Sequence, residues 1–240
     1  MDDELIVCVP GDWESREDFI GRVAAGTDGA FMLAGTILAH PRGQDHVELD
    51  FCDPDEEVAG AFEYGGQGRL TEETLARVAA HRSVAYLHFP RDFAAERLRL
   101  AKFTEVVAGC GGIAAMVETS GVAHEWERWF ALLRSAEPFD HYCACVVLAG
   151  DERHFYSCGM HNFGLPDAQI SREFGAPQAA DVLNRFNYYQ LSERPGLAPG
   201  HTFSLTADGP RFRLNLLPDL RHPGGDLFHN PRGLWEIARG

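Results

Sequence analysis

The stretch from His141 to Ile170 reads HYCACVVLAG DERHFYSCGM HNFGLPDAQI and sets the expected fold of the second half of the chain. Two apolar runs flank Gly150-Asp151, a dipeptide typical of a two-residue β-hairpin turn. Counting outward from this turn places Cys143 opposite Cys158, and directly opposite residues have Cβ atoms about 4.5–5.5 Å apart. The sequence therefore predicts an antiparallel hairpin, with strands over 141–149 and 152–158, that brings two thiols together.

The end of this stretch, from Tyr156 to Ile170, is the most promising site region. It gathers Cys158, His161, Asn162 and Asp167 among two glycines and a proline. Loops on a rigid scaffold often carry function. We therefore expect His161, Asn162 and Asp167 to bind a ligand, and we consider Cys158 and His161 as catalytic candidates.

The catalytic alternative needs more than these residue types. A cysteine nucleophile requires a nearby base and a lowered pKa, and the commonest role of a strand cysteine is that of a small buried apolar group. Zinc prefers a tetrahedral set of Cys and His. The spacings Cys143-x-Cys145 and Cys158-x-x-His161 form no recognised finger or ribbon. We predict neither a metal nor a cofactor.

A second group of candidates follows the predicted buried strand Ile113–Val117, a position where α/β folds often place sites. Glu118 and His124 are candidate ligand-binding residues there. Ser120 would complete a triad with His124 and an acid, but the chain has no Gly-x-Ser-x-Gly elbow. A cap or turn role for Ser120 is favoured.

The first half of the chain alternates strand and helix patterns. Its clearest helix runs from His124 to Ser135, with apolar residues at i, i+3, i+4 and i+7. Further expected elements are strands over 5–9, 30–39, 46–52 and 83–89, helices over 15–25, 71–81 and 92–108, a turn over 53–57 and a glycine-rich loop over 64–68.

The second half is patterned differently. Beyond the first hairpin it contains one long helix that begins near Pro177, a second hairpin across Asp208-Gly209, and a closing strand over 234–237. The predicted class is α+β, with mixed or antiparallel sheets and packed helices. We expect an α/β-patterned lobe over 1–136 and a hairpin-rich lobe over 137–240, forming one compact body or a single domain.

Composition narrows the expected partners. The 240 residues carry a formal charge of −15, and Lys102 is the only lysine among 21 basic residues. Scattered arginines form no basic stripe, so nucleic acid and anionic membranes are not expected partners. No apolar run approaches the roughly 18 residues of a membrane span, and the acidic N-terminus is unlike a secretory signal. We expect a cytoplasmic protein with six reduced cysteines.

Three segments carry a resemblance to a known family: Gly112–Gly121, Gly159–Ile170 and Leu197–Phe203. In their order they resemble the bacterial domain of unknown function family 4261, over residues 94–216. Asp167 stands where the family pattern has Glu. The resemblance implies one module and no known activity.

These observations lead to a non-catalytic module that binds a protein partner or a small ligand. The alternative is a thiol- or metal-dependent enzyme, possibly a hydrolase, that uses the 158–167 loop. A purely structural subunit that forms a homo-oligomer is the third possibility.

Overall fold

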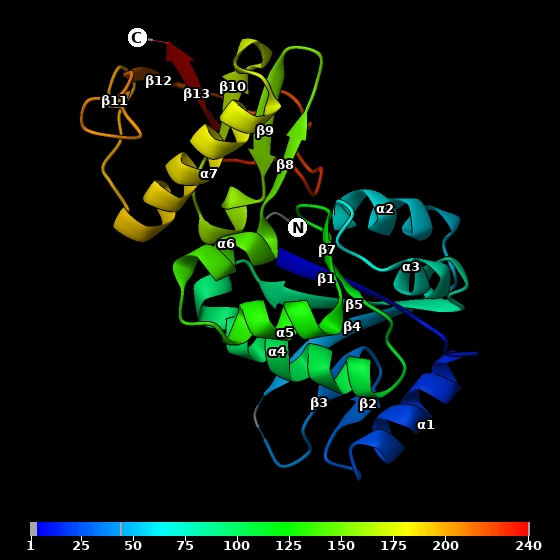
Figure 1. Ribbon diagram of the computed structural model, residues 1–240. Coiled ribbons are helices and arrows are strands. Elements are labelled where there is room, and N and C mark those ends of the chain that lie inside the picture. The colour runs from blue at the N-terminus through cyan, green and yellow to red at the C-terminus, as the bar shows by residue number, and fades with distance from the viewer. Residues whose placement is uncertain (1–3, 44, 240) are drawn as a thin grey trace. The chain divides into compact units, whose positions relative to one another are not determined.

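Two β-sheets and the helices packed on them make up the computed structural model, which describes residues 4–43 and 45–239 (Figure 1). The predicted α+β class is confirmed. Contacts within the chain divide it into two compact units, one ending at Ser135 and the other starting at Ala136. No helix in the described part of the chain is long and apolar enough to cross a membrane.

The first unit contains an antiparallel sheet of seven strands in the order β2-β3-β4-β5-β1-β6-β7. The pairing of β1 with β5 is its longest, running from Glu4 opposite Pro90 to Gly11 opposite Ser83. The strands are β1 Glu4–Gly11, β2 Met32–Ala34, β3 Ile37–Ala39, β4 His46–Cys52, β5 Ser83–Pro90, β6 Ala115–Val117 and β7 Val122–His124.

Five helices accompany this sheet, and four of them begin at a side chain that accepts a hydrogen bond from a free backbone N–H of the first turn. These N-caps are Ser15, Asp55, Thr71 and Asp92. The helices are α1 Arg16–Gly26, α2 Glu56–Gly66, α3 Glu72–Ala79, α4 Phe93–Gly109 and α5 Trp126–Arg134.

Apolar side chains cover both faces of the seven-stranded sheet. Successive residues of a strand point to opposite sides, so a continuous apolar strand contributes to both faces. Cys8 of β1 lies in a cluster with Phe62 of α2 and Val78 of α3. On the other face, the ring of Phe89 in β5 lies 6.5 Å from that of Phe103 in α4. This double burial explains why the strand over residues 5–9 reads as a continuous apolar run.

Two sequence predictions for this unit were wrong. The single strand expected over 30–39 is the hairpin β2–β3, which turns where Gly35 has φ +58°. The expected loop at 64–68 is partly helix, since Gly65 and Gly66 end α2. A Cβ on Gly65 would lie 2.1 Å from the carbonyl oxygen of Gly121. Glycine is therefore required where α2 approaches the β6–β7 turn, and it does not signal a loop.

The second unit holds a six-stranded sheet in the order β11-β12-β13-β10-β9-β8. β10 pairs with β13 in parallel, and the other neighbouring strands pair antiparallel. Its elements are α6 Pro138–Cys145, β8 Val147–Gly150, β9 His154–Cys158, the 3-10 helix η1 Met160–Phe163, β10 Asp167–Ser171, the 3-10 helix η2 Arg172–Phe174, α7 Ala176–Glu193, β11 Thr202–Phe203, β12 Phe212–Leu217 and β13 Leu234–Arg239.

The two faces of this sheet are covered differently. One face packs on α7, where Phe186 contributes to a cluster that includes Leu214 of β12 and Ile237 of β13. The other face carries polar residues, among them Asp167, and lies against the loop over 218–233, as the hydrogen bonds described below show.

The predicted register of the first hairpin was wrong. β8 and β9 pair with Val147 opposite Cys158, while Cys143 lies in α6. Two features account for the difference. Pro138 opens a helix where a strand was expected, and the Asp151 carboxylate accepts hydrogen bonds from two backbone N–H groups in a turn longer than two residues. Cys143 and Cys158 are therefore not cross-strand neighbours.

Candidate functional site

The predicted site segment is mainly interior structure. Asp167 is the first residue of β10, and its buried carboxylate has several hydrogen-bond partners. Oδ1 accepts from the Ser157 hydroxyl and from the Met160 backbone N–H, both at 3.1 Å, and Oδ2 accepts from the Asn230 amide at 2.6 Å. A buried charge needs such partners to be stable. Asp167 thus connects β9, η1 and the 218–233 loop.

A second carboxylate extends this arrangement. Asp219 accepts from the backbone N–H groups of Arg221 and Asn230, both at 3.0 Å. The Asn230 amide also donates to the Leu165 carbonyl oxygen at 3.0 Å. We call Ser157, Asp167, Asp219 and Asn230 the polar cluster. Its hydrogen bonds fasten the 218–233 loop to the polar face of the sheet.

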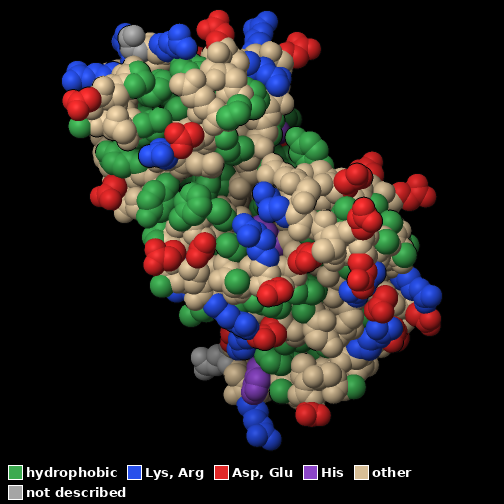
Figure 2. Space-filling model, in the orientation of Figure 1, with side chains coloured by type: hydrophobic (Ala, Val, Ile, Leu, Met, Phe, Trp, Pro, Cys, Tyr) green, Lys and Arg blue, Asp and Glu red, His purple; other side chains and the backbone are tan. Residues whose placement is uncertain are grey.

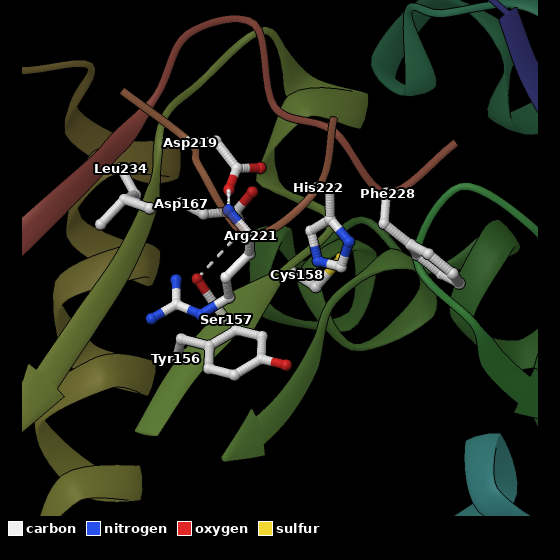
Figure 3. Close-up of a pocket in the computed structure, with 9 residues that line it drawn as sticks. All are labelled: Tyr156, Ser157, Cys158, Asp167, Asp219, Arg221, His222, Phe228 and Leu234. Atoms are coloured by element: carbon white, nitrogen blue, oxygen red, sulfur yellow. Dashed lines mark hydrogen bonds between the residues drawn. The ribbon is translucent and has the colours of Figure 1, made fainter. Parts of the chain in front are cut away.

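Arg221, which belongs to the same loop, also contacts the sheet (Figure 3). Its guanidinium lies 4.1 Å from the centre of the Tyr156 ring, and it donates to Asp151 at 3.0 Å and to Gln169 at 2.6 Å. Burial opposes ionisation of Asp151, but two backbone N–H groups and Arg221 outweigh it and lower the pKa of Asp151 to about 2. The loop is therefore held by charge-assisted hydrogen bonds at both ends of the contact.

A small pocket lies between the sheet and this loop (Figure 3), and we call it the polar pocket because Ser157, Asp219 and Arg221 are among its lining residues. Cys158 and His222 both line it, and the His222 ring packs 5.5 Å from that of Phe228. Burial, followed by the nearby carboxylates of Asp167 and Asp219, raises the pKa of the Cys158 thiol well above its ordinary value. The thiol therefore stays protonated at neutral pH, which is the opposite of what an activated nucleophile needs.

His161 does not share that pocket with Cys158. It is 2% exposed, and its Nδ1 lies 3.8 Å from Oδ2 of Asp167, beyond hydrogen-bond distance. Asn162 is fully buried beside it. Glycines with positive φ, Gly159 and Gly164, flank this 3-10 turn and fold it into the interior. The residues predicted to bind a ligand in this segment are thus packed inside the unit.

Glu118 and His124 belong to the first unit and do not form one site. Glu118 follows Met116 by two residues, and Met116 shares the sheet face that carries Cys8, α2 and α3. Burial is the main cause that raises the pKa of Glu118. His124 lies on the opposite face, where its ring stacks 5.7 Å from that of Trp129 in α5. The sheet separates the two side chains.

Metal binding requires that the fold bring several ligand side chains together. Among residues 4–43 and 45–239, no group of three or more His, Cys, Asp or Glu side chains is placed to hold a metal ion. Cys143 and Cys145 lie in α6, whereas Cys158 ends β9.

A groove on the α7 side of the second unit was missed by sequence reasoning. Its empty space, open solvent included, is about 650 Å³, compared with about 220 Å³ for the polar pocket. Its walls come from segments far apart in the sequence, so no local pattern could have revealed it. The lining residues are Gly164, Leu165, Pro166, Gln190, Pro195, Leu197, Leu216, Arg232 and Trp235.

The polar cluster borders this groove through the backbone. Asn230 bonds to the carbonyl oxygen of Leu165, and the amide of Gln190 donates to the carbonyl oxygen of Pro166 at 3.3 Å. These bonds position the turn over 164–166 that forms one wall. The cluster therefore supports the groove from behind.

The chain matches no family model, no curated protein and no solved structure. The resemblance to family 4261 stays a prediction.

Proposed function

We propose that the chain is a non-catalytic binding module that holds a protein partner or a small ligand in the groove of its second unit. The observation that carries the proposal is the groove itself. Leu165, Leu197 and Leu216 give it apolar walls, and Arg232 is the single charged residue in its lining. Binding sites are typically concave and mostly apolar, with a few polar groups that orient the ligand.

The polar cluster supports this assignment because its carboxylate oxygens already accept hydrogen bonds from the protein. The oxygens of Asp167 and Asp219 accept hydrogen bonds from within the unit, so they act as scaffold. An incoming ligand at these atoms would have to replace internal bonds. A ligand in the groove meets no such cost.

The rival function, a thiol-dependent enzyme, has weaker support. Cys158 is buried near carboxylates, and these surroundings disfavour its thiolate. The imidazole beside it in the polar pocket is His222, whereas the rival required His161. Turnover that Cys158→Ala or His222→Ala removes would favour this rival.

We also propose a cytoplasmic location and membership of family 4261, with proteins or small molecules as partners in preference to nucleic acid. The six free cysteines support a reducing compartment. On the face shown in Figure 2, acidic and basic side chains are interspersed, which gives little support to a phosphate-binding surface.

Trp235 offers a direct test, because it lines the groove while the other tryptophans, Trp13, Trp126 and Trp129, belong to the first unit. Protein labelled with 5-fluorotryptophan should give a ¹⁹F signal for Trp235 that Trp235→Phe identifies. Titration with a set of small apolar carboxylates should shift this signal and leave the other three in place. If neither these compounds nor the peptides described below move the Trp235 signal, the proposed function is wrong.

A further inference from the structure

The groove borders an open stretch of sheet edge. On its outer side, β12 pairs with the two-residue strand β11, and the backbone of Leu214 bonds to residues 200 and 201. Hydrogen-bonding direction alternates along an antiparallel strand. The N–H and C=O of Leu216 therefore point to the same outer edge as those of Leu214.

The preceding chain leaves that edge before it reaches Leu216. Residues 198–201 form a turn in which the His201 N–H donates to the Ala198 carbonyl oxygen, and Gly200 has φ +88°. Within the described residues, no backbone group pairs with Leu216 on this side. Leu216, which is part of the apolar wall of the groove, is also 42% exposed.

Charge points to the chemistry of the missing partner. Arg232 lies at the groove and is exposed, and its guanidinium forms no ion pair or hydrogen bond with any described residue. The groove lining contains no Asp or Glu, although the whole chain has 36 acidic residues. A carboxylate is therefore the charged group that this site would accept.

We propose that the groove binds an extended peptide that adds as a strand to β12 at Leu216, inserts an apolar side chain into the groove and places a carboxylate against Arg232. This inference rests on the proposed function and specifies its partner. In strand addition the main chain contributes affinity, and pockets for alternate side chains contribute specificity. Residues two apart on the peptide share a face, so the apolar side chain and an acidic one can enter together.

A set of matched probe peptides tests each part. The reference is acetyl-Thr-Val-Thr-Leu-Thr-Glu-amide, and a second peptide ends after its last Thr with a free carboxylate. A third replaces Glu by Gln. Two further versions of the reference peptide carry N-methyl groups on alternate residues. One version is methylated at the odd-numbered residues and the other at the even-numbered residues, so each blocks the N–H groups of one edge of the peptide. The readout is the ¹⁹F signal of Trp235.

We expect the reference peptide to shift the Trp235 signal and the Gln peptide to bind up to about fivefold more weakly, as for an exposed charge pair. Arg232→Gln should remove this difference. The control Arg213→Gln, at an exposed arginine on β12 whose side chain lies on the opposite sheet face, should preserve it. One N-methylated version should lose binding and the other should keep it, because only one of the two alternating sets of peptide N–H groups faces β12. Comparing the Glu peptide with the free-carboxylate peptide tells an acidic side chain from a chain end.

Three outcomes would overturn the inference. If small carboxylates shift the Trp235 signal but no peptide does, the groove binds small ligands and the strand-addition proposal fails alone. Equal binding by both N-methylated versions would exclude strand pairing. A dimer of the free protein in which a second copy covers Leu216, detected by sedimentation, would show that the edge serves self-association.

Discussion

The two sheets of this protein are covered in different ways. The seven-stranded sheet of the first unit is packed by apolar side chains on both faces, with Phe62 on one side and Phe103 on the other. The six-stranded sheet has an apolar face on α7 and a polar face that a hydrogen-bonded loop covers. An apolar face stabilises through buried area, whereas a polar face must satisfy every buried donor and acceptor.

The two kinds of cover indicate where a site can form. Polar residues that sequence reasoning selects for chemistry, such as Asp167, prove to be the groups that hold a polar cover in place. The open surface lies beside them, at the groove and the β12 edge. Four predictions test this contrast, and the ¹⁹F signals of the tryptophans report each unit separately.

Truncation of the apolar core should give the largest effect. Phe103→Ala removes a fully buried ring that contacts Phe31 and Phe89, and it should lower the free energy of unfolding by about 3–5 kcal/mol. Urea unfolding followed at the Trp129 signal measures the loss. Leu98→Ala, on the same helix but 60% exposed, is the control and should cost less than about 1 kcal/mol.

Loss of the central carboxylate should cost nearly as much in the second unit. Asp167→Ala leaves the Ser157 hydroxyl and the Met160 N–H without this acceptor and removes one of the two acceptors of the Asn230 amide, and we expect a loss of about 3 kcal/mol. The Trp235 signal should report unfolding at lower urea. Unchanged stability would mean that the cluster is not a scaffold, and the comparison of the two covers would fail.

The parts of the fold that could be predicted from the sequence are those that depend on residues close together in the chain. Ser15 and Thr71 cap helices as expected, and the apolar stripe of α5 buries Trp129 and Leu133. The register of β8 on β9 could not be predicted, because it depends on how the Asp151 side chain closes the turn. The groove could not be predicted from the sequence either, because its walls meet only through tertiary packing.

Two glycines of α2 test close packing in the first unit. Gly65→Ala would place a Cβ 2.1 Å from the Gly121 carbonyl oxygen, so the helix must move, at a cost of about 1–3 kcal/mol. Gly60→Ala is the matched control: its Cβ meets nothing within 4 Å, and it should stabilise the helix by about 0.5–1 kcal/mol. Thermal unfolding of the two variants should shift in opposite directions.

The smallest expected effect depends on pH. The folded pKa of Asp151, about 2, lies below its ordinary value, so its contribution is present at neutral pH and is lost as pH falls from about 5 towards 2. Its side chain is 39% exposed, and solvent screening limits the contribution to about 1 kcal/mol or less.

Asp151→Asn should therefore be less stable than the parent at pH 7 and approach it near pH 2.5. Urea titrations of the Trp235 signal across this range measure the difference. Asp181→Asn, which removes an exposed pair with Arg185 on α7, is the control and should cost less than about 1 kcal/mol. A constant gap for Asp151→Asn at all pH values would contradict the assignment.

The claim that the polar pocket is scaffold and not a reaction centre is tested most directly by the reactivity of Cys158. The native protein would be treated at pH 7 with a slight excess of iodoacetamide, and the modified cysteines would be located by mass spectrometry. We predict that the exposed Cys52 reacts first and that Cys158 reacts only after unfolding. Cys158 labelled faster than Cys52 in the folded protein would contradict the account and favour the thiol enzyme.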